Sequence, residues 1–301
     1  MGKGIKMRFS VKIIASVLCL SILLGGCGNS TVSADLTLAQ TDIGAITVSE
    51  DVCVVGLGEA SHCVKEYQEL KAEVFKALVQ NNGCRTFVIE GDFGSALKVD
   101  DYIHGGEGTA KEAAAVIGFR IYRTREMEEL IEWMRTYNET AKEGEDLHFY
   151  GMDMQWADNS KEYVFRILEQ AAPAVCAAYE ADLAFLNDED MFDISAEAFG
   201  QGMSMAESLI QEVDGAKDGI VEVFGNEGFA FARECAVSIY NCCNIRKSDQ
   251  EYNEVRDSYM AEKVKWLMPF SRRAPIMPAT SFSQTTSGRS SYSFAQSRAS
   301  S

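Results

Sequence analysis

Short apolar runs alternate with stretches of helical periodicity between residues 51 and 158, and this alternation limits the fold more than any other feature. The apolar runs lie at residues 52–57, 86–89 and 147–151. Continuous apolar runs of this length are typical of strands buried on both faces of a sheet. Strands separated by helices form parallel sheets, because a parallel crossover needs a long connection. The sequence therefore predicts an α/β core over residues 46–158.

Helical periodicity covers most of the remaining chain. In the core, helices are expected near residues 65–81, 95–103, 111–117 and 125–140, and Gly83 should end the first of them. Strand signals stop after about residue 159, and helices are expected near 159–171, 173–187, 195–213, 217–246 and 252–268. We therefore predict an all-helical insertion and return helix over residues 159–270. Three strands are few for such a sheet, so we expect the sheet to be incomplete, with a strand missing at the C-terminus of the chain.

The C-terminal 31 residues differ sharply in composition from the body. Ten of residues 271–301 are serine, none is acidic, and three of the four prolines of the chain lie at 269, 275 and 278. A polar segment without hydrophobic periodicity cannot bury enough apolar surface to fold. We expect residues 271–301 to be disordered, as a frameshifted or spliced tail would be.

The N-terminal residues have the pattern of an export signal. Four basic residues precede an apolar stretch over residues 13–24, which is too short to span a bilayer comfortably and ends at Gly25-Gly26-Cys27. This arrangement resembles a bacterial lipoprotein signal, which implies cleavage before Cys27, lipidation of Cys27 and anchoring to the extracytoplasmic face of the cell membrane. Residues 1–26 would then be a signal peptide and residues 27–45 a polar tether. A plain secretory signal or an uncleaved anchor is the alternative.

Charge and cysteine content exclude several other classes. The chain has 45 acidic and 28 basic residues, a net charge of −17, and such a surface repels the phosphate backbone of nucleic acids. Nine cysteines are present, without a CxxC pair, and seven remain after Cys19 and Cys27 are set aside. An odd number without metal-type spacing is a poor disulfide framework and a poor zinc pattern.

Acidic residues follow the ends of all three predicted strands. Glu59, Glu90 and Asp153 occupy these places, and ligands of open parallel sheets bind beyond the carboxyl ends of the strands. His62 follows Glu59 at the expected start of a helix. A carboxylate beside an imidazole fixes its tautomer and raises its basicity, so the pair can take a proton from water. Each of these residues could instead cap a helix, but their shared position favours a site.

The remaining candidates for chemistry are weaker. His104 precedes Gly105 in a turn expected to end a helix, and His148 lies in a predicted strand. Ser61 fits a helix cap better than a nucleophile. The GMSMA run at residues 202–206 lacks the second glycine of a nucleophile elbow and falls in a predicted helix.

Seven blocks in unbroken order resemble the erythromycin esterase family. They are GEASH at 58–62, KEY at 65–67, VIEGD at 88–92, YRTREM at 122–127, LIEWMRTYN at 130–138, FYGMDMQ at 149–155 and RDSYMAEKVKWL at 256–267. The resemblance covers about residues 51–268. It implies an α/β core with a large helical insertion and hydrolysis of the lactone ester of macrolide antibiotics, hence a link to antibiotic response, with a small-molecule ester as partner and no cofactor or metal.

The resemblance also assigns roles to residues. His62 would be the general base that activates water, Glu59 would orient it, and Glu90 would be a second catalytic carboxylate. Lys71 stands where the family often has arginine, so it would place a cation near the developing oxyanion or support the site. Further supporting residues would be Glu66, Asp153, Arg123 and Arg256.

One family feature is missing from the chain. In the family a buried strand ending in a Trp-Ala-His-Asn-x-His-like signature follows the last block, and its histidine also serves the site. Here no histidine follows His148. The chain could therefore be a C-terminally damaged and inactive member, and a lipoprotein that only binds a small molecule is one alternative. A metallohydrolase that uses His62, Glu59, Glu90 and Asp153 as metal ligands is another.

Overall fold

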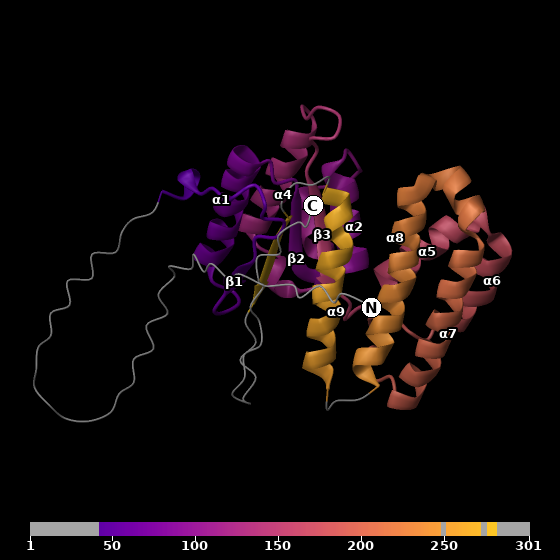
Figure 1. Cartoon of the computed structure of the whole chain (residues 1–301). Helices are drawn as coiled ribbons and strands as arrows, with labels where there is room; N and C mark the ends of the chain where they lie inside the picture. The colour runs from indigo at the N-terminus through magenta and orange to yellow at the C-terminus, as the bar shows by residue number, and fades with distance from the viewer. Residues whose placement is uncertain (1–41, 248–250, 272–275, 282–301) are drawn as a thin grey trace, which may run out of the picture.

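The computed structural model describes residues 42–247, 251–271 and 276–281, and it is an α/β structure with a small sheet (Figure 1). The core begins with a 3-10 turn, η1 (Ile43–Ala45), and strand β1 (Leu57–Glu59). The elements that follow are α1 (Lys65–Asn82), β2 (Thr86–Asp92), α2 (Phe93–Ile103), α3 (Ala110–Val116), η2 (Arg120–Tyr122), α4 (Arg125–Asn138) and β3 (His148–Asp153). The predicted α/β plan of this part is confirmed.

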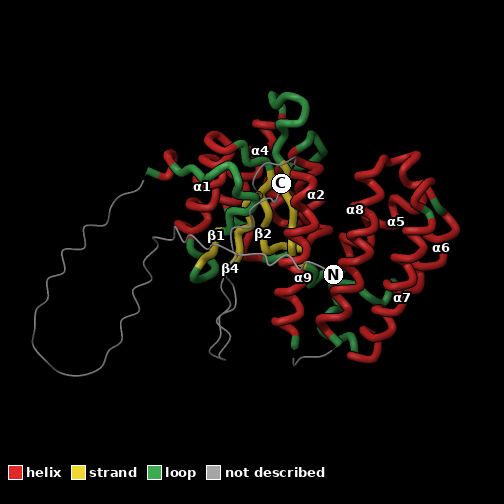
Figure 2. Tube along the Cα trace, in the orientation of Figure 1, coloured by secondary structure: helices red, strands yellow, loops and turns green. Residues whose placement is uncertain are grey.

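A fourth strand, β4 (Ile276–Ser281), completes the sheet and corrects two sequence predictions. All pairs are parallel, and the strand order is β1-β4-β2-β3, so β4 lies between the first two strands (Figure 2). The expected gap in the sheet is therefore filled, and the expected disorder of residues 271–301 is wrong for residues 276–281. Residues 272–275 and 282–301 lie outside the described residues.

Apolar side chains explain why this short segment enters the sheet. Ile276, Met277 and Ala279 are fully buried, and they alternate between the two faces of the sheet. Six residues were too few to show a periodic pattern inside a serine-rich tail. Pro278 lies opposite Val88 and cannot donate a ladder hydrogen bond, which is unusual in a central strand. Burial on both faces outweighs this lost bond.

Two apolar layers cover the two faces of the sheet. One contains Phe75, Leu78, Phe87, Phe149 and Ile131, so α1 and α4 cover this face. The other contains Val88, Tyr150 and Ile276 together with apolar residues of the C-terminal helices. Helix α1 ends where predicted, because Gly83 adopts the left-handed conformation (φ 66°, ψ 23°) that favours glycine.

The helical insertion is also confirmed. It consists of α5 (Asp158–Ala171), α6 (Pro173–Asp182), α7 (Ala196–Gly215) and α8 (Lys217–Arg246), which stand beside the sheet in Figure 1. Helix α8 changes direction at Gly225, whose φ of 73° is not helical. Helix α9 (Tyr252–Leu267) then returns to contact β3, and η3 (Met268–Ser271) follows it.

Smaller differences concern boundaries and the N-terminal segment. The first strand begins only at Leu57, the last residue of the predicted 52–57 run, and Val54 forms an isolated bridge to Ile276 before it. The helix predicted over 173–187 ends at Asp182.

The seven cysteines among the described residues are free. None of the described helices is long and apolar enough to cross a membrane. The signal peptide and Cys27 lie outside the described residues.

Candidate active site

The carboxyl ends of the strands gather the predicted acids at one edge of the sheet. Glu59 is the last residue of β1, Glu90 lies near the end of β2, and Asp153 ends β3. All three are buried, and Glu59 and Asp153 have side chains that are 2% and 0% exposed. Burial of three carboxylates requires positively charged or hydrogen-bonding partners. Lys71 and Arg256 supply the positive charges.

The first part of the site, which we call the histidine group, consists of Glu59, His62 and Lys71. Oε1 of Glu59 lies 3.0 Å from Nδ1 of His62, and Oε2 lies 2.7 Å from Nζ of Lys71. Gln68 adds a longer contact of 3.4 Å to the same Oε2 atom. The His62 side chain is 45% exposed, whereas Glu59 and Lys71 are buried. One carboxylate therefore joins a buried ammonium to an imidazole that reaches solvent.

These contacts assign the tautomer of His62. A carboxylate that is ionised only accepts hydrogen bonds, and Glu59 already accepts one from the ammonium of Lys71. Nδ1 of His62 must therefore carry the proton that it shares with Glu59, so in the neutral ring Nε2 is the basic nitrogen. A histidine oriented in this way can accept a proton from a bound water molecule.

The loop between β1 and α1 brings His62 to this position. Cys63 has a φ of 62°, and it is the one residue other than glycine with positive φ among the described residues. The left-handed conformation costs energy for a side chain with a Cβ atom, and such residues are concentrated at functional sites. Here it lies between His62 and the start of α1 at Lys65, so it redirects the chain from the loop into the helix that carries Lys71.

The second part of the site, which we call the arginine group, consists of Glu90, Asp153 and Arg256. The guanidinium of Arg256, on α9, contacts Glu90 Oε1 at 2.7 Å and the two carboxylate oxygens of Asp153 at 3.0 and 2.6 Å. Burial by itself lowers the pKa of Arg256, but Asp153 and Glu90 more than offset this effect and raise it above its usual value. The guanidinium therefore stays charged and fixes both carboxylates.

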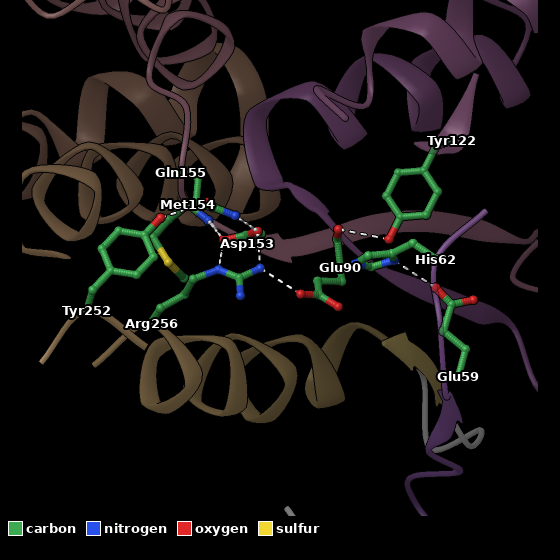
Figure 3. Close-up of polar contacts among 9 residues, drawn as sticks. All are labelled: Glu59, His62, Glu90, Tyr122, Asp153, Met154, Gln155, Tyr252 and Arg256. Atoms are coloured by element: carbon green, nitrogen blue, oxygen red, sulfur yellow. Dashed lines mark hydrogen bonds and ion pairs between the residues drawn. The ribbon is translucent and has the colours of Figure 1, made fainter. Parts of the chain in front are cut away.

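Further polar residues extend the arginine group. Gln155 donates to Asp153 at 2.7 Å and accepts from the hydroxyl of Tyr252 at 2.6 Å. The hydroxyl of Tyr122 donates to the backbone oxygen of Glu90 at 3.0 Å. Figure 3 shows these contacts, with the carboxylate of Glu90 between the guanidinium of Arg256 and the ring of His62 in that view.

Two more acids near this edge have raised pKa values. Burial raises the pKa of Asp257 to about 6, and the negative charges of Glu90 and Asp153 add to the rise while Arg256 opposes it. Burial also raises the pKa of Asp92 to about 7, against hydrogen bonds from Ser95 that lower it. Asp92 caps α2 through these bonds, so its role is structural. Asp257 is a site residue that the sequence analysis missed.

The sequence contained weak signals, or none, for the site residues that we did not predict. Asp257 lies directly after Arg256 in a block already quoted, so its charge was visible, but its burial was not. Gln155 closes another quoted block. Tyr122 is 32 residues from its partner Glu90 and Tyr252 is 97 residues from its partner Gln155, and nothing in the sequence indicates those contacts.

The structure brings only some of the predicted supporting residues to the site. Lys71 contacts Glu59 from a position that is 2% exposed, which favours support of Glu59 over contact with an oxyanion. Asp153 and Arg256 join the site as described above. Glu66 and Arg123 are exposed, and the described residues show no polar contact between their side chains and either group. Ser61 is exposed and does not cap α1, whose N-cap is Val64.

The metal-site alternative finds no support at this edge. Glu59 and Asp153 already face the ammonium of Lys71 and the guanidinium of Arg256, which would repel a divalent cation. The side chains that do gather as metal ligands within the described part of the chain are others, namely Asp100, His104 and His148.

Strand β4 ends at the same edge. Its Thr280 and Ser281 are in register with Gly58 and Glu59 of β1. The strand that the family resemblance led us to expect therefore has a counterpart beside Glu59, although no histidine follows His148 in the chain.

Fold and site together define a class: an α/β protein with a carboxylate–histidine pair and a buried carboxylate–arginine group at the carboxyl edge of a parallel sheet. The sequence profile of the erythromycin esterase family matches residues 79–279, more than half of the chain. The chain therefore belongs to the erythromycin esterase family. The matched range begins after the histidine group and includes the first four residues of β4.

A curated relative is similar in sequence to part of this chain, and three solved structures share its fold. Erythromycin esterase type II from Escherichia coli is 33% identical over 104 residues, which are 35% of this chain and 24% of that protein. A structure from Bacillus cereus has a TM-score of 0.67 at 21% identity and covers 77% of this chain and 57% of that one.

Two further structures share the fold. A protein described as a succinoglycan biosynthesis protein has a TM-score of 0.65 at 21% identity, over 79% of this chain and 58% of its own. A point mutant of the erythromycin esterase EreC in its open conformation has a TM-score of 0.59 at 17% identity, over 77% and 61%. This chain thus spans less than two thirds of each of these relatives.

Proposed function

We propose that this protein is a hydrolase of carboxylic esters, in which His62 activates water under the control of Glu59. The single observation that carries this proposal is the contact of 3.0 Å between Glu59 and Nδ1 of an imidazole that is 45% exposed. The buried partner fixes the ring, while the exposure lets water and substrate reach it. Membership of the erythromycin esterase family supports hydrolase chemistry.

The reaction begins when Nε2 of His62 takes a proton from water as the oxygen attacks the acyl carbon. A bond forms between the water oxygen and that carbon, and the carbonyl oxygen gains negative charge. The bond to the alkoxy oxygen then breaks, and the imidazolium returns its proton to this leaving group. Glu59 stabilises the imidazolium between the two steps, as an adjacent carboxylate does for a histidine base.

Glu90 would act as the second carboxylate. Arg256 holds it at 2.7 Å and is itself held by Asp153, so Glu90 has a fixed position. A carboxylate fixed beside the acyl centre can orient water or stabilise positive charge on His62. We propose a lactone as the substrate, with macrolides as the first class to test because the family is named after one. Lipidation of Cys27 and a membrane location belong to the same proposal.

A second candidate function is binding of a small molecule without turnover. The observation that favours it is that Thr280 and Ser281 are in register with Gly58 and Glu59, at the edge where the family resemblance implies a histidine. In that case the histidine and arginine groups would shape a polar binding site. Catalysis by His62 alone would then be slow.

The test measures hydrolysis of erythromycin, as the gain of one water in mass, and of a chromogenic aryl ester. We expect slow turnover by the purified chain that falls by about 10²–10⁴-fold in His62→Ala, the usual contribution of a general base. Glu59→Gln should lose activity as well, because the amide can no longer fix the tautomer or stabilise the imidazolium.

A matched control uses an exposed residue of the neighbouring helix. Glu69→Gln removes a surface carboxylate of α1 that pairs with Lys65, and it should leave the rate unchanged. Turnover that survives His62→Ala would refute the assignment of the base. Retained binding of the macrolide, with no turnover in the wild type, would instead favour the second candidate.

A further inference from the structure

The amino-terminal edge of the sheet carries a second group of titratable side chains, far in the fold from the strand ends that bear Glu59 and Glu90. Asp100 and His104 lie one helical turn apart at the end of α2, and Asp146 and His148 lie at the start of β3. We call these four residues the His/Asp cluster. It holds two of the three histidines in the chain.

Distances within the cluster are those of a compact site. His148 Nε2 is 3.1 Å from Asp146 Oδ2, and His148 Nδ1 is 3.5 Å from Asp100 Oδ1. His104 Nε2 is 3.7 Å from the same Asp146 oxygen, and the two imidazole rings are 5.0 Å apart. One ligand atom each of Asp100, His104 and His148 lies within 4.8 Å of the other two.

Surrounding contacts fix the orientation of these side chains. His104 Nδ1 lies 2.7 Å from the backbone oxygen of Asp100, so it donates its proton there and leaves Nε2 as the atom that faces Asp146. Asp100 Oδ1 accepts a hydrogen bond of 2.8 Å from the backbone nitrogen of Phe149. The His148 ring stacks on Tyr150 at 5.6 Å. Histidines that bind metals are usually held through their other ring nitrogen in this way.

The hydrogen-bonding arithmetic requires a cation among these groups. A neutral imidazole has one N–H, which in His104 is used by the backbone, so its Nε2 lone pair faces a carboxylate oxygen. A neutral His148 also has one N–H, but its two ring nitrogens face two carboxylates, those of Asp100 and Asp146. Its buried Nδ1 makes no hydrogen bond to the described residues. Acceptors that face each other at these distances repel, unless a proton or a metal ion lies between them.

We propose that the His/Asp cluster binds one divalent zinc ion that joins the end of α2 to the start of β3. Two imidazoles with carboxylates are a ligand set that suits zinc, whereas calcium and magnesium prefer oxygen ligands alone. The ion would be structural, because the cluster lies at the edge of the sheet opposite to the histidine group. Its ligands come from two elements, so binding stabilises their contact.

The test titrates zinc into the purified chain after treatment with EDTA and dialysis. We expect one equivalent to bind by calorimetry and the Tm to rise in excess zinc. His104→Asn should weaken zinc binding by at least ~100-fold, because it removes a ligand. The amide of this asparagine can still donate to the Asp100 oxygen, so the Tm without metal should stay close to that of the wild type. His148→Asn should weaken zinc binding in the same way.

Two controls separate this cluster from the exposed residues beside the active site. His62→Asn and Cys63→Ser should each retain the full equivalent and the same rise in Tm. Zinc binding that is lost in these variants but retained in His104→Asn would place the ion at the other edge and overturn the proposal. A wild type that binds no zinc would overturn it as well. Neither result depends on ester hydrolysis.

Discussion

The two parts of the candidate active site are built in opposite ways. The histidine group comes from 13 consecutive residues, from Glu59 at the end of β1 to Lys71 in α1, and its His62 side chain is 45% exposed. The arginine group joins residues that are 166 and 103 positions apart, and its side chains are 12% exposed or less. A short segment thus presents the exposed imidazole, and distant segments hold the buried carboxylates.

Charge balance differs in the same way. In the histidine group one ammonium, that of Lys71, faces one carboxylate, that of Glu59. In the arginine group the single guanidinium of Arg256 faces the carboxylates of Glu90 and Asp153, with Asp257 close by. Breaking a buried ion pair costs more than its formation gains, because the remaining charge is stranded in a medium of low polarity. The arginine group should therefore contribute more to stability and the histidine group more to catalysis. Three variants test this division.

The largest effect is expected for Arg256→Ala. It strands two buried carboxylates, so the free energy of unfolding should fall by about 3–5 kcal/mol, the usual cost of breaking a buried pair. Chemical denaturation at pH 7 measures it. Arg233→Ala is the matched control, since Arg233 pairs with Asp214 on the surface and such pairs contribute about 0–1 kcal/mol. Equal losses in both variants would contradict the division.

A smaller loss is expected for Lys71→Met, which removes one cation from one carboxylate. The free energy of unfolding should fall by about 2–3 kcal/mol, because Gln68 and His62 still contact Glu59. Ester hydrolysis should fall too, since the ionised carboxylate that orients His62 loses its partner. Lys65→Met, on the first turn of the same helix, changes an exposed lysine and should alter neither quantity. If hydrolysis is unaffected by Lys71→Met, then Lys71 has no supporting role.

The smallest effect concerns the pH dependence set by Asp257. Its pKa is about 6 in the folded protein and about 3.9 in an unfolded chain, so the folded state binds more protons between these values. Asp257 therefore lowers the free energy of unfolding by about 1 kcal/mol, after allowance for solvent screening, as the pH rises from about 4 to about 6. Asp92, whose pKa burial raises to about 7, adds a fall of its own over the same range. Asp257→Asn should remove only the part that Asp257 contributes. Glu254→Gln, an exposed change on the same helix, should retain it, and an unchanged slope in Asp257→Asn would show that burial does not raise this pKa.

Much of the fold could be predicted because it depends on local periodicity. The helices of the core and of the insertion follow from apolar spacing, and Gly83 ends α1 as its conformational freedom predicts. The fourth strand could not be predicted in this way. Ile276–Ser281 contains a proline and lies among serines, and only burial between β1 and β2 makes it a strand. Its stability is a tertiary effect.

The same distinction applies to the active site. The sequence by itself placed Glu59 and His62 together, because a strand end, a tight turn and a helix start fix these two residues within a few positions of each other. It also placed Glu90 and Asp153 at one edge, since parallel strands share a direction. Only the tertiary structure decided that Lys71 supports Glu59, that Arg256 joins two carboxylates, and that Glu66 and Arg123 stay apart. Those contacts depend on how helices pack across the sheet, and packing is set by the whole core and not by local spacing.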